Sequence, residues 1–315
     1  MATGVNLAQL RALVAVAESG GFGSAADELR ISQSAVSHAV AALERAVGAP
    51  VLHRGARVRL TPLGEQLLPH ARAATAAAEA IATIAARHQG EPVGTVRLAA
   101  PTTVCQGLLP ELLGAWRAAH PRVTVRIFEG EDDELDAWLA SGTADAAVLI
   151  DPEPAPAGAL PLGQDSMHAL LRRDHPLAQQ PVVDIRDLAD DAFLLSEGGC
   201  ERQIREIHRR AGARFAPAHR IRDVGTLIGM VNAGIGVTVM PALAHAMLPP
   251  GCVLVPLEPR LARRLVLTGP ANRPWHPALA ALMATAATAL ALPATQRPAT
   301  GAARATTPVG VAGSA

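Results

Sequence analysis

The sequence predicts a multidomain α/β protein, in which a small helical unit, a long connecting helix and a two-lobed α/β region follow one another. Three observations support this. Residues 22–48 have the pattern of two short helices joined by a tight turn, the next segment repeats apolar residues at heptad spacing, and strand and helix patterns alternate from Val93 to Leu292. A chain of 315 residues suits two or three domains.

The first helix is expected from Leu7 to about Ala17, because its apolar residues recur on one face, and it should end at Gly20. The following pair begins with Ser24 as the expected N-cap. Ile31 should be a buried turn residue, and Ser32 should cap the second helix. The second helix has one apolar face, formed by Val36, Val40, Leu43 and Val47.

Short polar side chains occupy the start of the opposite face of this second helix. They are Gln33, Ser34, Ser37 and His38. A helix with one buried face and a polar N-terminal end can enter the major groove of DNA and contact base edges. The alternative is a helical hairpin with another use.

A short β-hairpin is predicted around residues 51–60, and it contains Arg54, Arg57 and Arg59. Beside a helix-turn-helix, such a wing would contact the phosphate backbone, with Arg54 and Arg57 as the DNA-binding candidates. The alternative is a hairpin that only adds solubility.

A helix from Pro62 to about His88 is predicted next, with Thr61 as its cap. Its heptad positions are Leu67, Ala71, Ala74, Ala78, Ile81 and Ala85. A stripe this long needs a partner, which is either the same helix of a second subunit or the chain's own C-terminal region.

The remaining chain alternates strands and helices, which predicts parallel strands with right-handed crossovers. The expected strands are 95–100, 123–128, 144–150, 167–171, 193–195, 219–222, 237–240 and 265–268, and the expected helices are 108–119, 132–140, 202–211, 225–232 and 277–292. Residues 293–315 lack periodicity and are expected to be a disordered tail.

Composition narrows the function classes. The net charge is zero, and all 28 basic residues are Arg, so any attraction for nucleic acid must come from a local patch. Cys105, Cys200 and Cys252 are isolated and lack metal-ligand spacing, which favours a reducing compartment and predicts no metal or other cofactor. We expect neither an export signal nor a membrane span, and therefore a cytoplasmic protein.

A small-molecule site is expected between the lobes, where strands end and helices begin. Thr102 and Thr103 follow the first strand, Ser196 and Gly199 follow a strand of the second lobe, and Thr226 opens a later helix. Hydroxyls beside helix N–H groups suit an anion. The alternatives are that the two threonines are only helix caps, and that the acidic run from residue 129 to 134 favours a cationic or hydroxylated ligand.

The segments LAQLRALVAVAESGGFGSAADELRISQSAVSHAVAALERAVGAPVLHR and VRLTPLGEQLLPHA resemble the LysR-type transcriptional regulators, and a weaker similarity continues to about Leu292. The resemblance implies a winged helix-turn-helix DNA-binding domain over 1–61 and a linker and dimerisation helix over 62–88. It also implies a two-lobed, periplasmic-binding-protein-like effector-binding domain over 93–292. Lobe I is expected over about 93–159 and 266–292, and lobe II over about 160–265.

The resemblance further implies a bacterial regulator that binds double-stranded promoter DNA as a dimer or tetramer, responds to a small-molecule effector and has RNA polymerase as a possible partner. Two residues depart from the family pattern: Ser34 stands where Pro is usual, and His38 where Arg is usual. Cys200 follows a strand where peroxide-sensing members carry a reactive cysteine, yet the next cysteine is Cys252. The alternative is an inert buried thiol.

Two other function classes remain as alternatives, an enzyme and a transport-type binding protein on the same two-lobed fold. No phosphate-binding glycine loop, nucleophile elbow or metal-ligand cluster is found in the sequence, so no catalytic residue is expected. The N-terminal helix-turn-helix opposes a transport role.

The hairpin generates the first testable prediction. We expect Arg54→Ala to weaken binding to every DNA sequence, because a phosphate contact carries no sequence information. The slope of log affinity against log salt concentration should become shallower by about 1, because one phosphate contact is lost. A titration of binding against salt concentration measures this. An unchanged salt slope would contradict the assignment.

Overall fold

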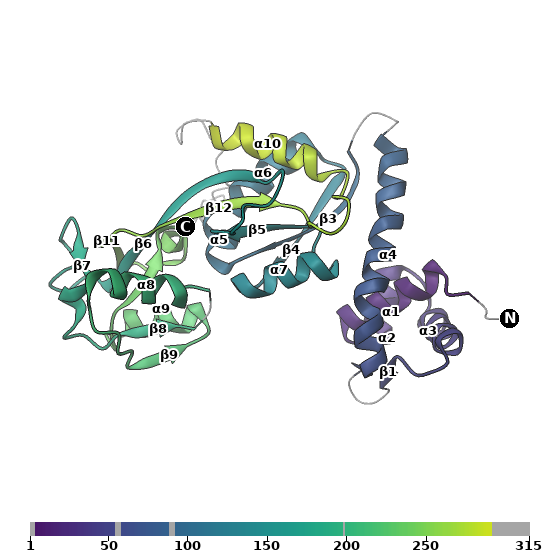
Figure 1. Cartoon of the computed structure of the whole chain (residues 1–315), viewed down its shortest axis with the longest axis horizontal. Coiled ribbons are helices and arrows are strands. Elements are labelled where there is room, and N and C mark those ends of the chain that lie inside the picture. The colour runs from purple at the N-terminus through teal and green to yellow at the C-terminus, as the bar shows by residue number, and fades with distance from the viewer. Residues whose placement is uncertain (1–3, 54–57, 88–91, 198, 292–315) are drawn as a thin grey trace, which may run out of the picture.

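The computed structural model describes residues 4–53, 58–87, 92–197 and 199–291. A helical N-terminal unit, a long helix and a two-lobed α/β region follow along the chain (Figure 1). The multidomain α/β architecture predicted from the sequence is therefore confirmed. The predicted tail over 293–315 lies outside the described residues.

The N-terminal unit contains α1 (Leu7–Ser19), α2 (Phe22–Leu29) and α3 (Gln33–Val47), followed by β1 (Leu52–His53) and β2 (Arg59–Leu60). The Ser32 side chain accepts a hydrogen bond from the Ala35 amide, and Gly48 ends α3 in the left-handed conformation, as the sequence signals predict. Val36 and Val40 are fully buried in the core of this unit. The predicted apolar face of α3 is thus confirmed.

Two local predictions are wrong. Ser24 lies inside α2, which begins at Phe22 after Gly21 without a side-chain cap. Ile31 is 47% exposed. The reason is the end of α2: Arg30 adopts a left-handed conformation, and the Ile31 amide donates to the Ala26 carbonyl. Ile31 therefore closes the turn with its backbone, while its side chain points out of the helical core.

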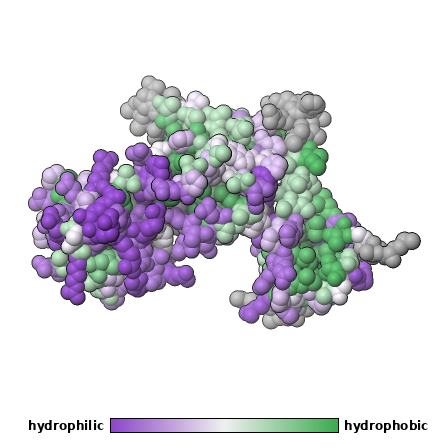
Figure 2. Space-filling model, in the orientation of Figure 1, coloured by the Kyte–Doolittle hydropathy of each residue, from purple (hydrophilic) through white to green (hydrophobic). Residues whose placement is uncertain are grey.

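The long helix α4 (Pro62–Arg87) begins as predicted, with the Thr61 hydroxyl accepting from the Gly64 amide at 3.0 Å. Its first half packs on the N-terminal unit, where Ala71 is 1% exposed. Further along, Ile81 is 69% exposed, and apolar surface follows α4 in Figure 2. The first half of the predicted apolar stripe is therefore buried against the N-terminal unit, and the second half is exposed. The side chain of Ala85 lies outside the described residues.

Lobe I is built on the parallel strands β3 (Gly94–Ala100), β4 (Val123–Glu129) and β5 (Ala146–Ile150). Its helices are α5 (Thr102–Gly107), α6 (Leu109–Ala119), α7 (Asp132–Ser141) and α10 (Leu279–Ala291). The returning strand β12 (Ala262–Thr268) pairs antiparallel with β5. The three strands of the first series are parallel as predicted, and α10 completes the core of the lobe.

Lobe II contains α8 (Glu201–Ala211) and α9 (Val224–Asn232), and its strands are β6 (Leu160–Arg172), β7 (Val183–Asp184), β8 (Leu194–Ser196), β9 (His219–Ile221), β10 (Thr238–Pro241) and β11 (Cys252–Glu258). The purely parallel arrangement expected here is wrong, because β6 pairs antiparallel with β10, β11 and β12. Strand β11 was not predicted at all.

The long strand β6 and its neighbour β12 run side by side between the lobes (Figure 1). Arg263 lies opposite Asp165 in their register. Its Nη2 donates to Asp165 Oδ2 at 2.5 Å, and both side chains are at most 3% exposed. This buried ion pair therefore sits where the chain crosses from one lobe to the other.

A second buried ion pair lies in lobe I. Arg97 donates to the Asp145 carboxylate through its backbone amide, Nε and Nη2, at 3.0, 3.0 and 2.9 Å. Burial raises the pKa of Asp145, but the hydrogen bonds from Arg97 outweigh it, and the net pKa lies below the ordinary value. Asp145 therefore adds stability above the unfolded-state pKa, and this contribution is lost as pH falls through the lower folded-state pKa.

We expect Asp145→Ala to lower the free energy of unfolding by about 3 kcal/mol, because it leaves Arg97 buried without its partner. The variant should also lose less stability than the parent between about pH 4 and pH 2. Denaturant titrations at several pH values measure both effects. The exposed Asp136→Ala is the matched control, and equal stability of the two variants would contradict the prediction.

Candidate functional site

The N-terminal end of α3 presents the predicted polar side chains at the surface. Gln33, Ser34 and His38 are exposed, and Ser37 is half-buried. The Ser32 and Ser34 hydroxyls lie 2.9 Å apart. The structure thus brings all four predicted residues together on one helix end, opposite the buried face.

The hairpin beside α3 pairs Leu52 with Leu60 and His53 with Arg59. Arg59 is exposed. Arg54 and Arg57 lie outside the described residues. An exposed polar helix end flanked by a basic hairpin has the arrangement that a winged helix-turn-helix uses on duplex DNA.

A second candidate site is a cavity of about 70 Å³ between the two lobes. Thr102 and Thr103 line it from lobe I, and Ser196 and Gly199 line it from lobe II. Four of the five residues predicted for a small-molecule site therefore meet at one cavity. Thr226 does not line it: its amide and hydroxyl donate to Asp223, the cap of α9, at 2.6 and 2.7 Å.

The charged side chains that line the cavity are of both signs: Glu131, Asp132, Arg222 and Arg263. The Thr102 hydroxyl donates to Glu129 Oε1 at 2.6 Å, so the acidic side chain at the end of β4 is engaged by a neighbour. Thr103 and Ser196 are buried. Val148, Leu149 and Ile150, at the end of β5, fill the cores of lobe I and do not line the cavity.

The sequence did not predict Arg263, which is 2% exposed and lines the cavity. Its Nη2 binds Asp165, while its Nε has no hydrogen-bond partner among the described residues. A buried guanidinium N–H without a partner costs free energy unless an acceptor reaches it. Within the described part of the chain, Arg263 therefore carries an unpaired buried donor on a side chain that lines the cavity.

Asp132 was also missed as a cavity residue. It begins α7 and faces lobe II, where a Cβ atom built on Gly199 would lie 3.8 Å from its Oδ1. Burial raises the pKa of Asp132 to about 6, although Arg263 and Arg202 act in the opposite direction. The sequence shows the acidic run that contains Asp132, but it does not show which side of the helix faces the cavity.

Cys200 lines the same cavity, immediately before α8. Burial raises the pKa of its thiol to about 11, although nearby Arg263 acts in the opposite direction. The thiol is therefore protonated at neutral pH, whereas redox-active cysteines have lowered pKa values. This environment favours the inert-thiol alternative.

Within the described ranges, no group of three or more His, Cys, Asp or Glu side chains is placed to hold a metal ion. In the same part of the chain, no helix combines the length and apolar character needed to cross a membrane.

Comparison with family models matches two segments. Residues 7–65 match the bacterial regulatory helix-turn-helix protein model of the lysR family, and residues 89–291 match the LysR substrate binding domain. Together the two models cover the N-terminal unit and both lobes.

Curated relatives agree with the family models. The chain is 38% identical over 243 residues to a probable hydrogen peroxide-inducible genes activator of Mycobacterium avium, covering 76% of this chain and 78% of the relative. It is 30% identical over 281 residues to the transcriptional dual regulator GltC of Bacillus subtilis, covering 87% and 93%.

Solved structures show the same architecture. A cysteine variant of full-length OxyR from Pseudomonas aeruginosa is 27% identical, with a TM-score of 0.67 over 90% of this chain and 95% of that chain. Full-length CbnR complexed with its target DNA is 22% identical, with a TM-score of 0.65 over 90% and 99%. The second likeness concerns the fold alone.

The raised pKa of Asp132 generates a pH prediction. Its folded-state pKa exceeds the unfolded value of 3.8, so ionisation in the folded protein costs stability as pH rises from about 4 to 6, and the cost persists above pH 6. We expect Asp132→Asn to gain about 1 kcal/mol relative to the parent between pH 4 and pH 7. The exposed Asp133→Asn is the control; parallel stability curves for parent and Asp132→Asn would contradict the assignment.

Proposed function

The chain belongs to the LysR-type family of transcriptional regulators, and on this premise we propose that it binds promoter DNA through the end of α3 and senses a small molecule in the interlobe cavity. The observation that carries this proposal is the presence, in one chain, of an exposed polar helix end on a helix-turn-helix and a buried polar cavity between two lobes. The first site suits a duplex, and the second suits a metabolite.

For DNA, we assign base-edge or adjacent phosphate contacts to Gln33, Ser34, Ser37 and His38. Their exposure on one side of α3 supports this. Arg54 and Arg57 are assigned to the phosphate backbone, on the strength of their charge and their place in the hairpin. Since the chain carries no net charge, affinity depends on these local contacts.

For the effector, we propose a small molecule with an anionic oxygen. The buried Nε of Arg263 supports an acceptor at this point, and Thr103 and Ser196 provide hydroxyls nearby. A cavity of about 70 Å³ is small beside the pockets of about 300–1,000 Å³ that hold drug-sized ligands. A larger effector would therefore require the lobes to separate.

A response to peroxide is the second candidate. It is favoured by the name of the Mycobacterium avium relative, a probable hydrogen peroxide-inducible genes activator, and by the position of Cys200 in the cavity. The raised pKa of this thiol opposes it. Promoter-binding assays in the presence of peroxide, and separately in the presence of small carboxylates, distinguish the two candidates.

For assembly, we propose that the exposed half of α4 pairs with the same helix of a second subunit. Ile81 and its small neighbours provide an apolar surface on which helices can approach closely. Two subunits then present two α3 helices to two half-sites, and a pair of dimers forms a tetramer. The proposed units are residues 1–61 for DNA binding, 62–88 for linkage and 93–292 for effector binding.

We expect Ser37→Ala to change the sequence preference of DNA binding, because a hydroxyl that contacts a base edge favours some bases over others. Selection from a randomised duplex library, followed by electrophoretic mobility shifts on DNA upstream of the gene, measures the change. The control is Ser19→Ala on α1, whose hydroxyl donates to the Ala15 and Gly21 carbonyls.

Equal base preferences for Ser37→Ala and the parent would contradict the role of this residue. Failure of the parent protein to bind any duplex from its own promoter region at low ionic strength, with and without cell metabolites, would contradict the proposed function as a whole.

A further inference from the structure

Helix α7 touches two parts of the molecule that the proposed function assigns to different tasks. Its first residue, Asp132, lines the interlobe cavity. At its other end, Gly142 ends the helix with a φ of +76° and lies against α4: a Cβ built on Gly142 would be 3.5 Å from the Ala73 amide nitrogen and 3.5 Å from Arg72 Cβ. A helix of 10 residues spans about 15 Å, so one short rigid element connects the cavity with the long helix.

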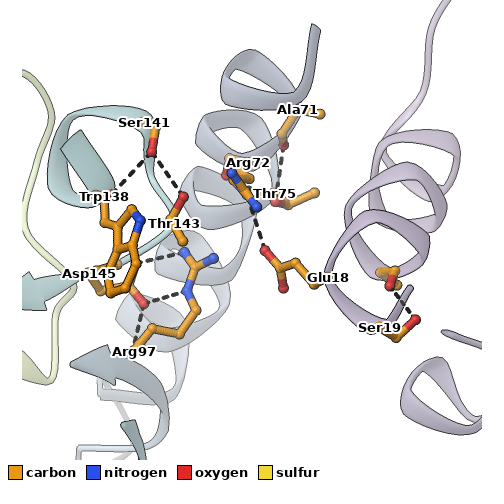
Figure 3. Close-up of polar contacts among 12 residues, drawn as sticks. Glu18, Ser19, Ala71, Arg72, Thr75, Arg97, Trp138, Ser141, Thr143 and Asp145 are labelled. Carbon is orange, nitrogen blue, oxygen red and sulfur yellow. Dashed lines mark hydrogen bonds and ion pairs between the residues drawn. The ribbon is translucent and has the colours of Figure 1, made fainter. Parts of the chain in front are cut away.

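The C-terminal turn of α7 is fixed to lobe I, as Figure 3 shows in part. The Ser141 hydroxyl lies 2.9 Å from the Thr143 hydroxyl, and the Ala144 amide donates to the Trp138 carbonyl at 3.0 Å. The Asn272 side chain donates to the Ala140 carbonyl at 3.1 Å. These contacts make the last turn, Gly142 and their neighbours in lobe I one body, so a displacement of α7 together with this body moves Gly142 and is not absorbed in the turn.

On the other side of this contact, α4 is tied to the DNA-binding unit. Arg72 Nε donates to Glu18 Oε1 of α1 at 3.1 Å, with both side chains largely buried (Figure 3). A second contact joins lobe I directly to α2: Arg126 Nη1 of β4 donates to Glu28 Oε1 at 2.9 Å. We call the Gly142 contact on α4 and the Glu28–Arg126 pair together the docking seam.

The docking seam is not a tightly packed interface. It borders a cavity of about 710 Å³, lined from the DNA-binding unit by Arg11 and Glu28, from α4 by Glu79, and from lobe I by Arg97 and Arg126. Arg126 and Glu28 are 56% and 31% exposed, and exposed ion pairs contribute little stability. An interface that borders a cavity and includes an exposed ion pair can open at little cost in buried contacts.

We propose that α7 couples the interlobe cavity to the DNA-binding unit, by seating Gly142 on α4 at a docking seam that opens and closes within one chain. The inference rests on the proposed function for the cavity, and adds the route by which occupancy reaches α3. A ligand that binds beside Asp132 shifts α7, the shift changes the fit of Gly142 on α4, and α4 carries α1 and the attached helices with it.

The first experiment traps the closed seam. The Cβ positions of residues 72 and 142 lie 3.5 Å apart, which is within the range for a disulfide. We expect the full-length double variant Arg72→Cys with Gly142→Cys to form a bridge within one chain under mild oxidation. It should migrate as a cross-linked monomer on a non-reducing gel. Each single variant keeps the three native cysteines and is the control for bridges that involve them.

The second experiment opens the seam by charge. Arg126→Glu places like charges at the contact with Glu28, and should slow trapping at least about fivefold at low salt. Adding Glu28→Arg restores opposite charges and should restore the rate. Arg117→Glu, on α6 of the same lobe, changes the net charge equally and should leave the rate unchanged.

The third experiment tests the coupling to the cavity. Asp132→Asn should change the trapping rate at least about fivefold, whereas Asp136→Asn, exposed on the same helix, should not. Gly142→Cys places a side chain at positive φ, so a readout without new cysteines is also needed. Promoter affinity should change about fivefold in Arg126→Glu. It should return to the parent value in the double variant Arg126→Glu with Glu28→Arg.

The outcomes separate the claims. Absence of an intrachain bridge in a folded double variant, together with unchanged promoter affinity in Arg126→Glu, would overturn the docking seam. Trapping that responds to Arg126→Glu but not to Asp132→Asn would overturn the coupling through α7. If the parent protein binds no promoter DNA, while the double-cysteine variant still forms its intrachain bridge, the proposed function is overturned and the docking seam is not.

Discussion

The buried ion pair between Arg263 and Asp165 is the constraint on which the interlobe cavity depends. The two residues face each other across β6 and β12, the strands that join the lobes. If one strand slipped by one residue relative to the other, the two charges would lie on opposite faces of the sheet. Each of them would then be buried without a partner. The pair thereby fixes the strand register, and with it the positions of the threonines of lobe I relative to Ser196 and Gly199 of lobe II. On the proposed function, the same guanidinium supplies the N–H for an oxygen of the effector.

Local chemistry made most of the elements predictable. Ser32, Thr61 and Gly48 follow the stereochemistry of helix ends, which depends on a few neighbouring residues. Ser24 and Ile31 show the limit: α2 begins three residues earlier than expected, after Gly21, and a left-handed Arg30 turns Ile31 outward. Strand β11 escaped prediction because Pro256 interrupts its pattern, and because its pairing with β6 involves residues about 85 positions apart in the chain.

The candidate site was predictable to the same degree. Thr102 and Ser196 could be named because ligands of such folds bind where strands end, and strand ends are visible in sequence. Arg263 and Asp132 could not, because their importance arises from contacts made only after β12 returns from the end of the chain. Thr226 illustrates the converse, since its hydroxyl is used by the adjacent Asp223. The residues proposed to face DNA were easier, because a single amphipathic helix decides which side chains are exposed.

The division of α4 into a half buried in its own domain and a half with uncovered apolar side chains has an evolutionary consequence. Replacing Ala71 disturbs the core of the DNA-binding unit, whereas replacing Ile81 leaves that core intact. On the proposed pairing, subunit choice can therefore diverge between duplicated genes while DNA recognition is retained. Two proteins that arose by gene duplication could then bind the same operator sequences without forming hetero-oligomers. Their responses to different metabolites would stay independent within the same cell.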